Sequence, residues 1–141
     1  MSAEVRTLLE TEIPPLLVAG LGSGPIVDCP VLSGRALDNT ERPDQYVVLV
    51  AGDAKERGGV VFLVEVEFKA VVPLDDPDAR TVATRRLRAI SDWLEDTDCP
   101  LLGYCSDTLK IHGFSTGGVT DEDGARSYAE ILTVTFGAMA L

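Results

Sequence analysis

The first residues whose types suggest chemistry are the glycines of LLVAGLGSGP, Leu16 to Pro25, because many phosphate-binding loops follow an apolar run with closely spaced glycines. Such a loop also needs a following helix, whose first backbone amides point at the anion. Here Pro25 and a segment without helical period follow instead. The spacing is G-x-G-x-G, whereas a dinucleotide site needs G-x-G-x-x-G, and no Gly-Lys-Ser/Thr of a P-loop is present. We therefore predict a turn between two short extended segments, and no cofactor.

His112 is the only histidine in the sequence, so histidine-based general-base or nucleophilic catalysis would have to use it. It lies in LKIHGF, a predicted strand in which Ile111 and Gly113 occupy the opposite face. Ser106 and Asp107 are near in sequence, but strand geometry gives no reason for them to converge on the ring. We interpret His112 as a half-exposed sheet residue. No catalytic residue and no enzymatic activity are predicted.

The late acidic segment VTDEDGARSYAE is a candidate calcium loop. With Gly124 as the turn glycine, Asp121 and Asp123 fall on ligand positions and Glu130 on the closing bidentate position. The first ligand position then holds Val119, and the flanking sequences are typical of strands rather than of the required helices. We predict a solvated acidic hairpin loop, and no metal site.

Two charged groups carry weaker signals. Glu65 and Glu67 share one strand face and form a possible carboxylate pair, although two acids on the wet face of a strand are usually only solvated. RTVATRRLR places a basic group on the non-apolar side of a predicted helix, without interleaved aromatic residues. It favours a solvated face or a self-interface over nucleic-acid binding. This group consists of Arg80, Arg85, Arg86 and Arg88.

The elements that position these residues begin with a short amphipathic helix over Ala3–Glu12, which has apolar residues at helical spacing. Pro14 and Pro15 are expected to stop it. The polar segment from Gly34 to Gln45 has no period and is expected to be a surface loop or an arm.

Two β-branched and aromatic runs, YVVLVAG and GVVFLVEVEFKAVV, flank the polar tip DAKERGG and predict a β-hairpin. Its second strand alternates between a buried and a mostly wet face, which fixes the register. The buried face comprises Phe62, Val64, Val66, Phe68 and Ala70, and the wet face Leu63, Glu65, Glu67 and Lys69.

A helix is predicted after Asp78, a plausible N-cap, and is expected to cover the sheet. Trp93 lies beside its apolar stripe, so we expect it to pack the helix against the sheet or against a neighbouring subunit. LKIHGF and SYAEILTVTFGAMAL then form two strands around the loop STGGVTDEDGAR. The stripe consists of Ala83, Leu87, Ile90 and Leu94.

The order helix, hairpin, helix, hairpin predicts an α+β fold in which two helices pack a mainly antiparallel sheet, as a single domain over residues 1–141.

Apolar residues make up 45% of the sequence, without a run long enough to span a membrane. Acidic residues interrupt the first segment, which therefore is not a secretory signal, and the protein is expected to stay in the cytosol. The three cysteines lack C-x-x-C spacing and are expected to be small thiols in a reducing compartment. A net charge of −11 disfavours duplex DNA as a tightly held ligand.

With this order of elements, the chain resembles the tail terminator proteins of long-tailed bacteriophages. The resemblance is carried by EVRTLLETEIPPLL, the hairpin QYVVLVAG to GVVFLVEVEFKA, the acidic break LDDPDA, the helix VATRRLRAISDWL and the closing LKIHGFSTGG to RSYAEILTVTF. Together these segments span nearly the whole chain. VAGLGSGPIVDCP and GRALDNTERPDQ depart from the pattern, which leaves a neighbouring neck, tail completion or tail tube role open.

The resemblance implies a structural virion protein, assembled in the host cytoplasm, that forms a homohexameric ring on the tail tube. Such a ring ends tail polymerisation and joins the tail to the head. Its expected partners are further copies of itself, the tail tube protein and a head-tail connector or neck protein. DNA would be only a passing neighbour in an acidic lumen. A small cytosolic adaptor or binding module is the alternative from another class.

Ring subunits need head-to-tail contacts that close. We expect these contacts to come from the segment Gly34 to Gln45 and from two mobile polar tips that order on docking. Deleting Thr120 to Gly124 is expected only to shorten a loop. The predicted interface residues are Lys55, Glu56 and Arg57 in the first tip, and Asp121, Glu122, Asp123 and Arg126 in the second.

Overall fold

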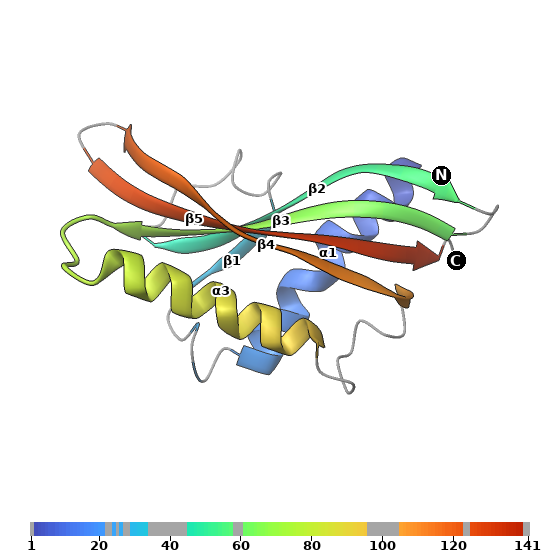
Figure 1. Cartoon of the computed structure of the whole chain (residues 1–141), viewed down its shortest axis with the longest axis horizontal. Coiled ribbons are helices and arrows are strands. Elements are labelled where there is room, and N and C mark those ends of the chain that lie inside the picture. Colours follow the sequence, from blue (N-terminus) through green and yellow to red (C-terminus); the bar gives the residue numbers. More distant parts are fainter. Residues whose placement is uncertain are drawn as a thin grey trace.

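The structure is a computed structural model of the chain and describes residues 2–21, 24, 26, 29–33, 45–57, 61–95, 105–122 and 125–139. In these ranges it contains the helices α1 (Ser2–Leu21) and α3 (Ala79–Glu95) and the strands β1 (Val31–Ser33), β2 (Tyr46–Arg57), β3 (Val61–Pro73), β4 (Cys105–Glu122) and β5 (Ala125–Met139) (Figure 1). The strands form one sheet in the order β1-β2-β3-β5-β4. β1 runs parallel to β2, and the other pairs are antiparallel. The predicted α+β class is confirmed.

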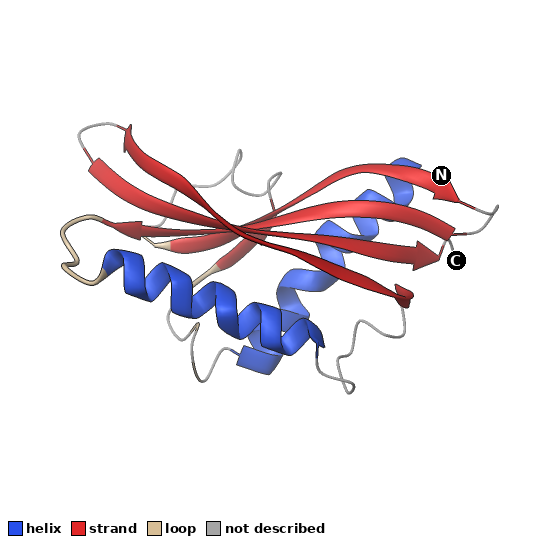
Figure 2. Ribbon diagram, in the orientation of Figure 1, coloured by secondary structure: helices blue, strands red, loops and turns tan. Residues whose placement is uncertain are grey.

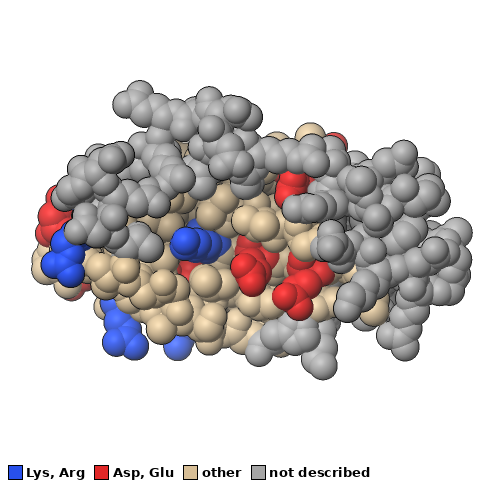
Figure 3. Space-filling model, turned by 90° about the horizontal axis from the view of Figure 1, so that it is seen from above, with Lys and Arg blue, Asp and Glu red and all other residues tan. Residues whose placement is uncertain are grey.

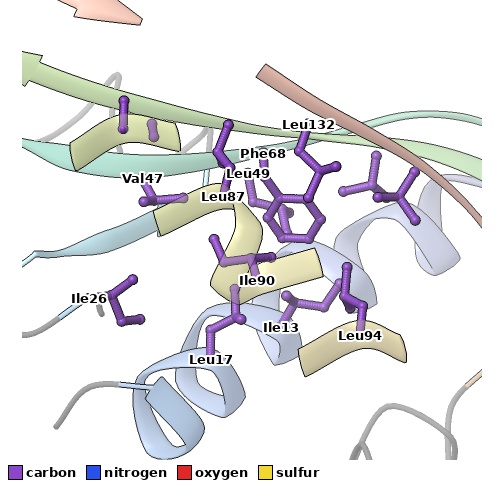
Figure 4. Packing of buried hydrophobic residues seen from close by; sticks show 14 of the residues in the cluster. Ile13, Leu17, Ile26, Val47, Leu49, Phe68, Leu87, Ile90, Leu94 and Leu132 are labelled. Carbon is purple, nitrogen blue, oxygen red and sulfur yellow. The ribbon is translucent and has the colours of Figure 1, made fainter. Parts of the chain in front are cut away.

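Both helices lie on the same face of the sheet (Figure 2). Helix α1 packs mainly on β1 and β2, and α3 packs on β3 and β5. We call the opposite side of the sheet the outer face. The core fills the space between the helices and the sheet, where Phe68 of β3 lies among residues of both helices (Figure 4).

Strand β3 confirms the predicted alternation. Val64, Val66 and Phe68 point into the core and are fully buried, whereas Glu65 and Glu67 point to the outer face and are exposed. Burial of each large apolar side chain stabilises the fold by about 1.5–3 kcal/mol before entropy is counted. A shift by one residue would expose this whole set, so burial fixes the register of β3.

Helix α1 does not end where the sequence predicts. It continues through Pro14 and Pro15 to Leu21, so our expectation that these prolines stop it is wrong. An interior proline costs a helix about 3 kcal/mol, because it lacks the N–H donor and its ring crowds the preceding turn. On either side of the prolines, Ile13 and Leu17 are fully buried. Their burial on the sheet offsets that cost, and tertiary packing overrides the local preference.

The glycine run of the sequence therefore begins in a helix and not after a strand. The backbone N–H groups of Gly24 and Ile26 donate to the carbonyl oxygen of Leu21, at 3.0 and 3.4 Å, and so close the helix end. The predicted extended segment before the glycines is wrong. The strand that would precede a phosphate-binding loop is therefore also missing at this position.

Helix α3 follows the prediction. Asp78 precedes its first residue, and the Asp78 carbonyl oxygen accepts a hydrogen bond from the Val82 N–H at 2.9 Å, as an N-cap residue does. The predicted stripe is buried against the sheet. It consists of Ala83, Leu87, Ile90 and Leu94.

Trp93 packs against the end of α1. A Cβ atom placed on Gly20 would lie 2.7 Å from the Trp93 Nε1 atom, which is closer than real Cβ contacts. Gly20 thus lets the two helices approach each other. Trp93 is only half buried, and it packs against the core cluster between the helices and the sheet.

Strand β4 contains irregularities that the sequence did not predict. Its register with β5 shifts between Ile111 and Gly113 and again between Thr116 and Gly118. Both glycines have positive φ angles, 128° and 76°, which L side chains rarely adopt. Ile111 and Gly113 oppose consecutive residues of β5, so they lie on opposite faces. Our expectation that they share a face opposite His112 is wrong, because a bulge breaks the alternation at this point.

Candidate interaction surface

The first predicted interface tip is mostly strand. Lys55, Glu56 and Arg57 are the last residues of β2 and pair with Leu63, Phe62 and Val61 of β3. The expected tip over residues 53–59 is therefore wrong for its first five positions. Polar composition indicated a loop, but antiparallel pairing satisfies the backbone groups of polar residues as well as those of apolar ones.

The second predicted tip is also strand. Asp121 and Glu122 end β4, Arg126 lies in β5, and Asp121 pairs with Arg126. Asp123 lies outside the described residues. The expected loop over residues 115–126 is thus wrong, and deleting Thr120 to Gly124 would remove strand residues rather than shorten a loop.

The geometry of this hairpin also bears on calcium. The β5 partner of Asp121 is Arg126, four residues from Glu130. At about 3.4 Å per strand residue, Asp121 and Glu130 are about 14 Å apart along the hairpin, too far for one ion. Glu130 instead accepts a short hydrogen bond from the Tyr128 hydroxyl. Among the described residues, no three of His, Cys, Asp and Glu are close enough to hold a metal ion.

Strand β4 forms an edge of the described sheet and is 18 residues long. On the side of β4 away from β5, its backbone N–H and C=O groups have no neighbouring strand in the described ranges. Beside this edge, Phe114 and Val119 are 43% and 52% exposed. They oppose Leu132 and Tyr128 of β5, and therefore lie on the helix side of the sheet, where the cover is incomplete at this edge. An open edge with apolar side chains is a surface where another strand adds.

The exposed side of α3 is basic over residues 80–88. Arg80, Arg85 and Arg88, together with Thr81 and Thr84, line a shallow hollow of about 430 Å³. The three arginines are exposed to solvent. Their positions over nine residues place them along about two helical turns on one side of the helix. The hollow is suited to acidic groups, because a guanidinium binds carboxylate or phosphate oxygens through paired N–H donors.

The outer face of the sheet carries the opposite charge at its middle. Glu65 and Glu67 are exposed there, and Lys69 follows on the same face, half exposed. Figure 3 looks onto this face and shows acidic side chains gathered over the middle of the sheet, with basic ones toward one end. The sequence thus identified both charged groups, and the sheet separates them onto opposite layers of the molecule.

Arg86 does not belong to the solvated face on which the sequence placed it. It is 7% exposed, and its Nη2 atom donates to the Gln45 Oε1 atom at 2.9 Å. The Nε and Nη1 atoms have no hydrogen-bond partner among the described residues. The periodicity could not show this, because Arg86 lies at the boundary between the apolar and basic sides of α3.

Cys29 is buried close to this guanidinium. Burial raises the pKa of the Cys29 thiol above its ordinary value of 9.0, and the positive charge of Arg86 offsets only part of that effect. The thiol is therefore neutral at physiological pH, and a neutral buried thiol is a poor nucleophile. Cys99 lies outside the described residues, and the side chains of Cys105 and His112 are likewise not described.

Glu10 of α1 lies beneath β2 and is 6% exposed. The backbone N–H of Ala51 donates to its Oε1 atom at 3.4 Å, where the register between β2 and β3 shifts. The Glu10 carboxylate thus accepts a hydrogen bond from a backbone N–H at the point where the pairing of β2 with β3 is interrupted. We assign Glu10 a structural role.

No family model and no curated protein matches the chain. Neither described helix combines the length and apolar character needed to cross a membrane. The surfaces above are therefore interpreted from their own chemistry.

Proposed function

We propose that this chain is a structural virion protein of the tail terminator type. It forms a ring, expected to be a homohexamer, that caps the phage tail tube, stops tail polymerisation and joins the tail to the head or neck. The proposal rests on the resemblance of the element order to that family, and it assigns the protein to the virion after assembly in the host cytoplasm.

The observation that supports this proposal most is the edge position of β4, which has no neighbouring strand on one side within the described residues. An 18-residue edge strand flanked by the exposed side chains of Phe114 and Val119 suits a protein whose final state is bound to other subunits. Strand addition supplies backbone hydrogen bonds, and the two apolar side chains add contact area next to them. In the proposed ring, this edge meets a strand of the last tail tube ring.

The charge of the chain is compatible with DNA as a passing neighbour. A net charge of −11 repels phosphate, so a ring of such subunits lets DNA move through its lumen without holding it. An acidic lumen is part of the proposal.

The β4 edge also favours a second candidate, a small cytosolic adaptor module that adds a partner's strand to its own sheet. A neighbouring neck, tail completion or tail tube role would use the same edge within a virion. The mass in solution at the highest soluble concentration separates the adaptor module from the terminator. An adaptor stays monomeric or dimeric, whereas a ring subunit forms higher oligomers.

The double variant Phe114→Lys and Val119→Lys tests the role of β4. Both side chains are exposed, so we expect the subunit to fold and to form rings, but tails made with it should be overlong or fail to join heads. Val18→Lys is the matched control, because Val18 is 48% exposed on α1, away from β4. Electron microscopy of the particles gives the readout. Tails of normal length with the double variant would remove β4 as the docking edge, and normal particles from a strain lacking the gene would remove the terminator function.

A further inference from the structure

The two charged surfaces of the molecule lie on opposite layers. The arginine hollow is on the solvent side of α3, whereas Glu65 and Glu67 are on the outer face of the sheet, with the whole core between them. Figure 2 shows both helices on one side of the sheet. A single molecule cannot bring these groups together, so their complementarity can be used only between molecules.

We propose that the arginine hollow of α3 binds the outer sheet face of a second copy of this chain. In this contact the carboxylates of Glu65 and Glu67 enter the hollow lined by Arg80, Arg85 and Arg88. The inference deepens the proposed ring function and rests on it, because it names the surfaces through which neighbouring copies join.

The spacing of the charged groups fits this contact. Glu65 and Glu67 are two residues apart on one strand face, which separates their side chains by about 6.8 Å. One turn of an α-helix rises about 5.4 Å, so arginines on successive turns can each face one carboxylate. Arginine forms paired hydrogen bonds with carboxylates, and Thr81 and Thr84 supply hydroxyl donors between the guanidinium groups.

Lys69 sets the register of the contact. It lies on the same face as Glu65 and Glu67, two residues beyond Glu67, and it is half exposed. A shift of the hollow toward Lys69 would place like charges opposite each other, which is strongly unfavourable at an interface. The row of two acids and one base thus fits the hollow in one position.

The second copy is the occupant that the charges favour. The chain as a whole carries a net charge of −11, so the arginine hollow is an exception on an acidic molecule. A copy that docks in it presents a different surface from the one it occupies, which makes the contact heterologous. Each copy then keeps one free surface of each kind, and the series ends only when a ring closes.

Charge reversal tests the contact. Arg85→Glu with Arg88→Glu reverses the hollow, and Glu65→Lys with Glu67→Lys reverses the sheet face. We expect each double variant to remain folded by circular dichroism, because all four side chains are exposed, and to associate at least a hundredfold more weakly. Combining all four substitutions in one chain should restore the oligomer, because the complementarity is then reversed on both sides.

Mixing the two double variants gives a result that no general loss of stability would produce. The normal sheet face of the first variant is complementary to the normal hollow of the second, and the two reversed surfaces are complementary to each other. We therefore expect each variant alone to stay monomeric and the mixture to form larger oligomers in which the two variants alternate, measured by native mass spectrometry. The matched control is Asp75→Lys, which reverses an exposed acid outside both surfaces and should leave the oligomer unchanged.

The outcomes separate this inference from the proposed function. Wild-type oligomers that tolerate both reversals would overturn the contact but leave the ring intact. Failure of the four-substitution chain to recover would also overturn it. A wild-type protein that stays monomeric at its highest soluble concentration and does not cap tail tubes would overturn the ring function together with the contact.

Discussion

Arg86 combines a permanent charge with almost complete burial, a combination that proteins usually balance with a carboxylate. In the described part of the chain its one hydrogen bond goes to the neutral oxygen of Gln45. Removal of a guanidinium from water costs several kcal/mol, and one neutral hydrogen bond returns only a fraction of this. The buried charge of Arg86 therefore lowers the stability of the fold.

Replacement of Arg86 by methionine should keep the aliphatic packing and remove the buried charge. We expect the free energy of unfolding to stay equal or to rise by about 1–3 kcal/mol, measured by urea denaturation. Arg85→Met is the control, because Arg85 is exposed one position away and its replacement should change stability by less than about 0.5 kcal/mol. A loss of more than about 2 kcal/mol in Arg86→Met would mean that an anionic partner compensates this charge in solution.

At the scale of elements, the contact between Trp93 of α3 and Gly20 of α1 joins the two helices where no strand lies between them. The absence of a Cβ atom at Gly20 is what allows the indole ring to approach the helix backbone. Because Trp93 is only half buried, its truncation should cost less than the 3–5 kcal/mol typical of a fully buried tryptophan.

Gly20→Ala should therefore destabilise the protein by about 1 kcal/mol, even though alanine is the better helix former. In a Trp93→Ala background the same substitution should stabilise by up to about 1 kcal/mol, because the clash is gone and the helix propensity remains. Thermal melting of the four proteins in this double-mutant cycle gives the coupling. Equal effects of Gly20→Ala in both backgrounds would show that the two helices do not touch at this point.

The elements that the sequence predicted are those whose periodicity reports directly on burial. β3 alternates cleanly and α3 has one apolar stripe, so both were identified with nearly correct bounds. The sequence predicts too short an α1, because the burial of Leu17 beyond the prolines depends on the sheet beneath it. The three residues of β1 are too few to show a period. The ends of β2 and β4 are polar and so resemble loops in sequence, since strand pairing there leaves no trace in hydropathy.

The candidate surfaces were predicted only in part, for a related reason. The arginines of α3 and the pair Glu65 and Glu67 are visible in the sequence, because each group follows the period of its own element. The exposure of Phe114 and Val119 depends on which strand lies at the edge of the sheet. Strand order is a property of the tertiary fold, so local patterns do not contain it.

At the scale of the whole molecule, two electrostatic effects of opposite sign act on assembly. The net charge of −11 makes copies repel each other at long range, whereas the arginine hollow and the acidic sheet face attract at contact. Salt screens the long-range repulsion first, because separated surface charges are screened more than charges in contact.

Association of the wild-type protein should therefore peak at intermediate salt. We expect it to strengthen as sodium chloride rises toward about 0.15 M, where the Debye length is about 8 Å, and to weaken again toward about 1 M. Analytical ultracentrifugation over this range provides the measurement. A steady strengthening up to the highest salt would instead indicate an interface dominated by apolar contacts.

The two glycine bulges of β4 affect how a subunit behaves before it assembles. A long, flat, open strand is a template on which identical chains stack without limit into fibrous aggregates. Gly113 and Gly118 break this edge into short stretches of different twist, and an incoming strand with regular hydrogen-bond spacing can follow only one of them at a time. The bulges thus protect an unassembled subunit from aggregation through this edge. A partner strand with matching irregularities can still bind along the full edge.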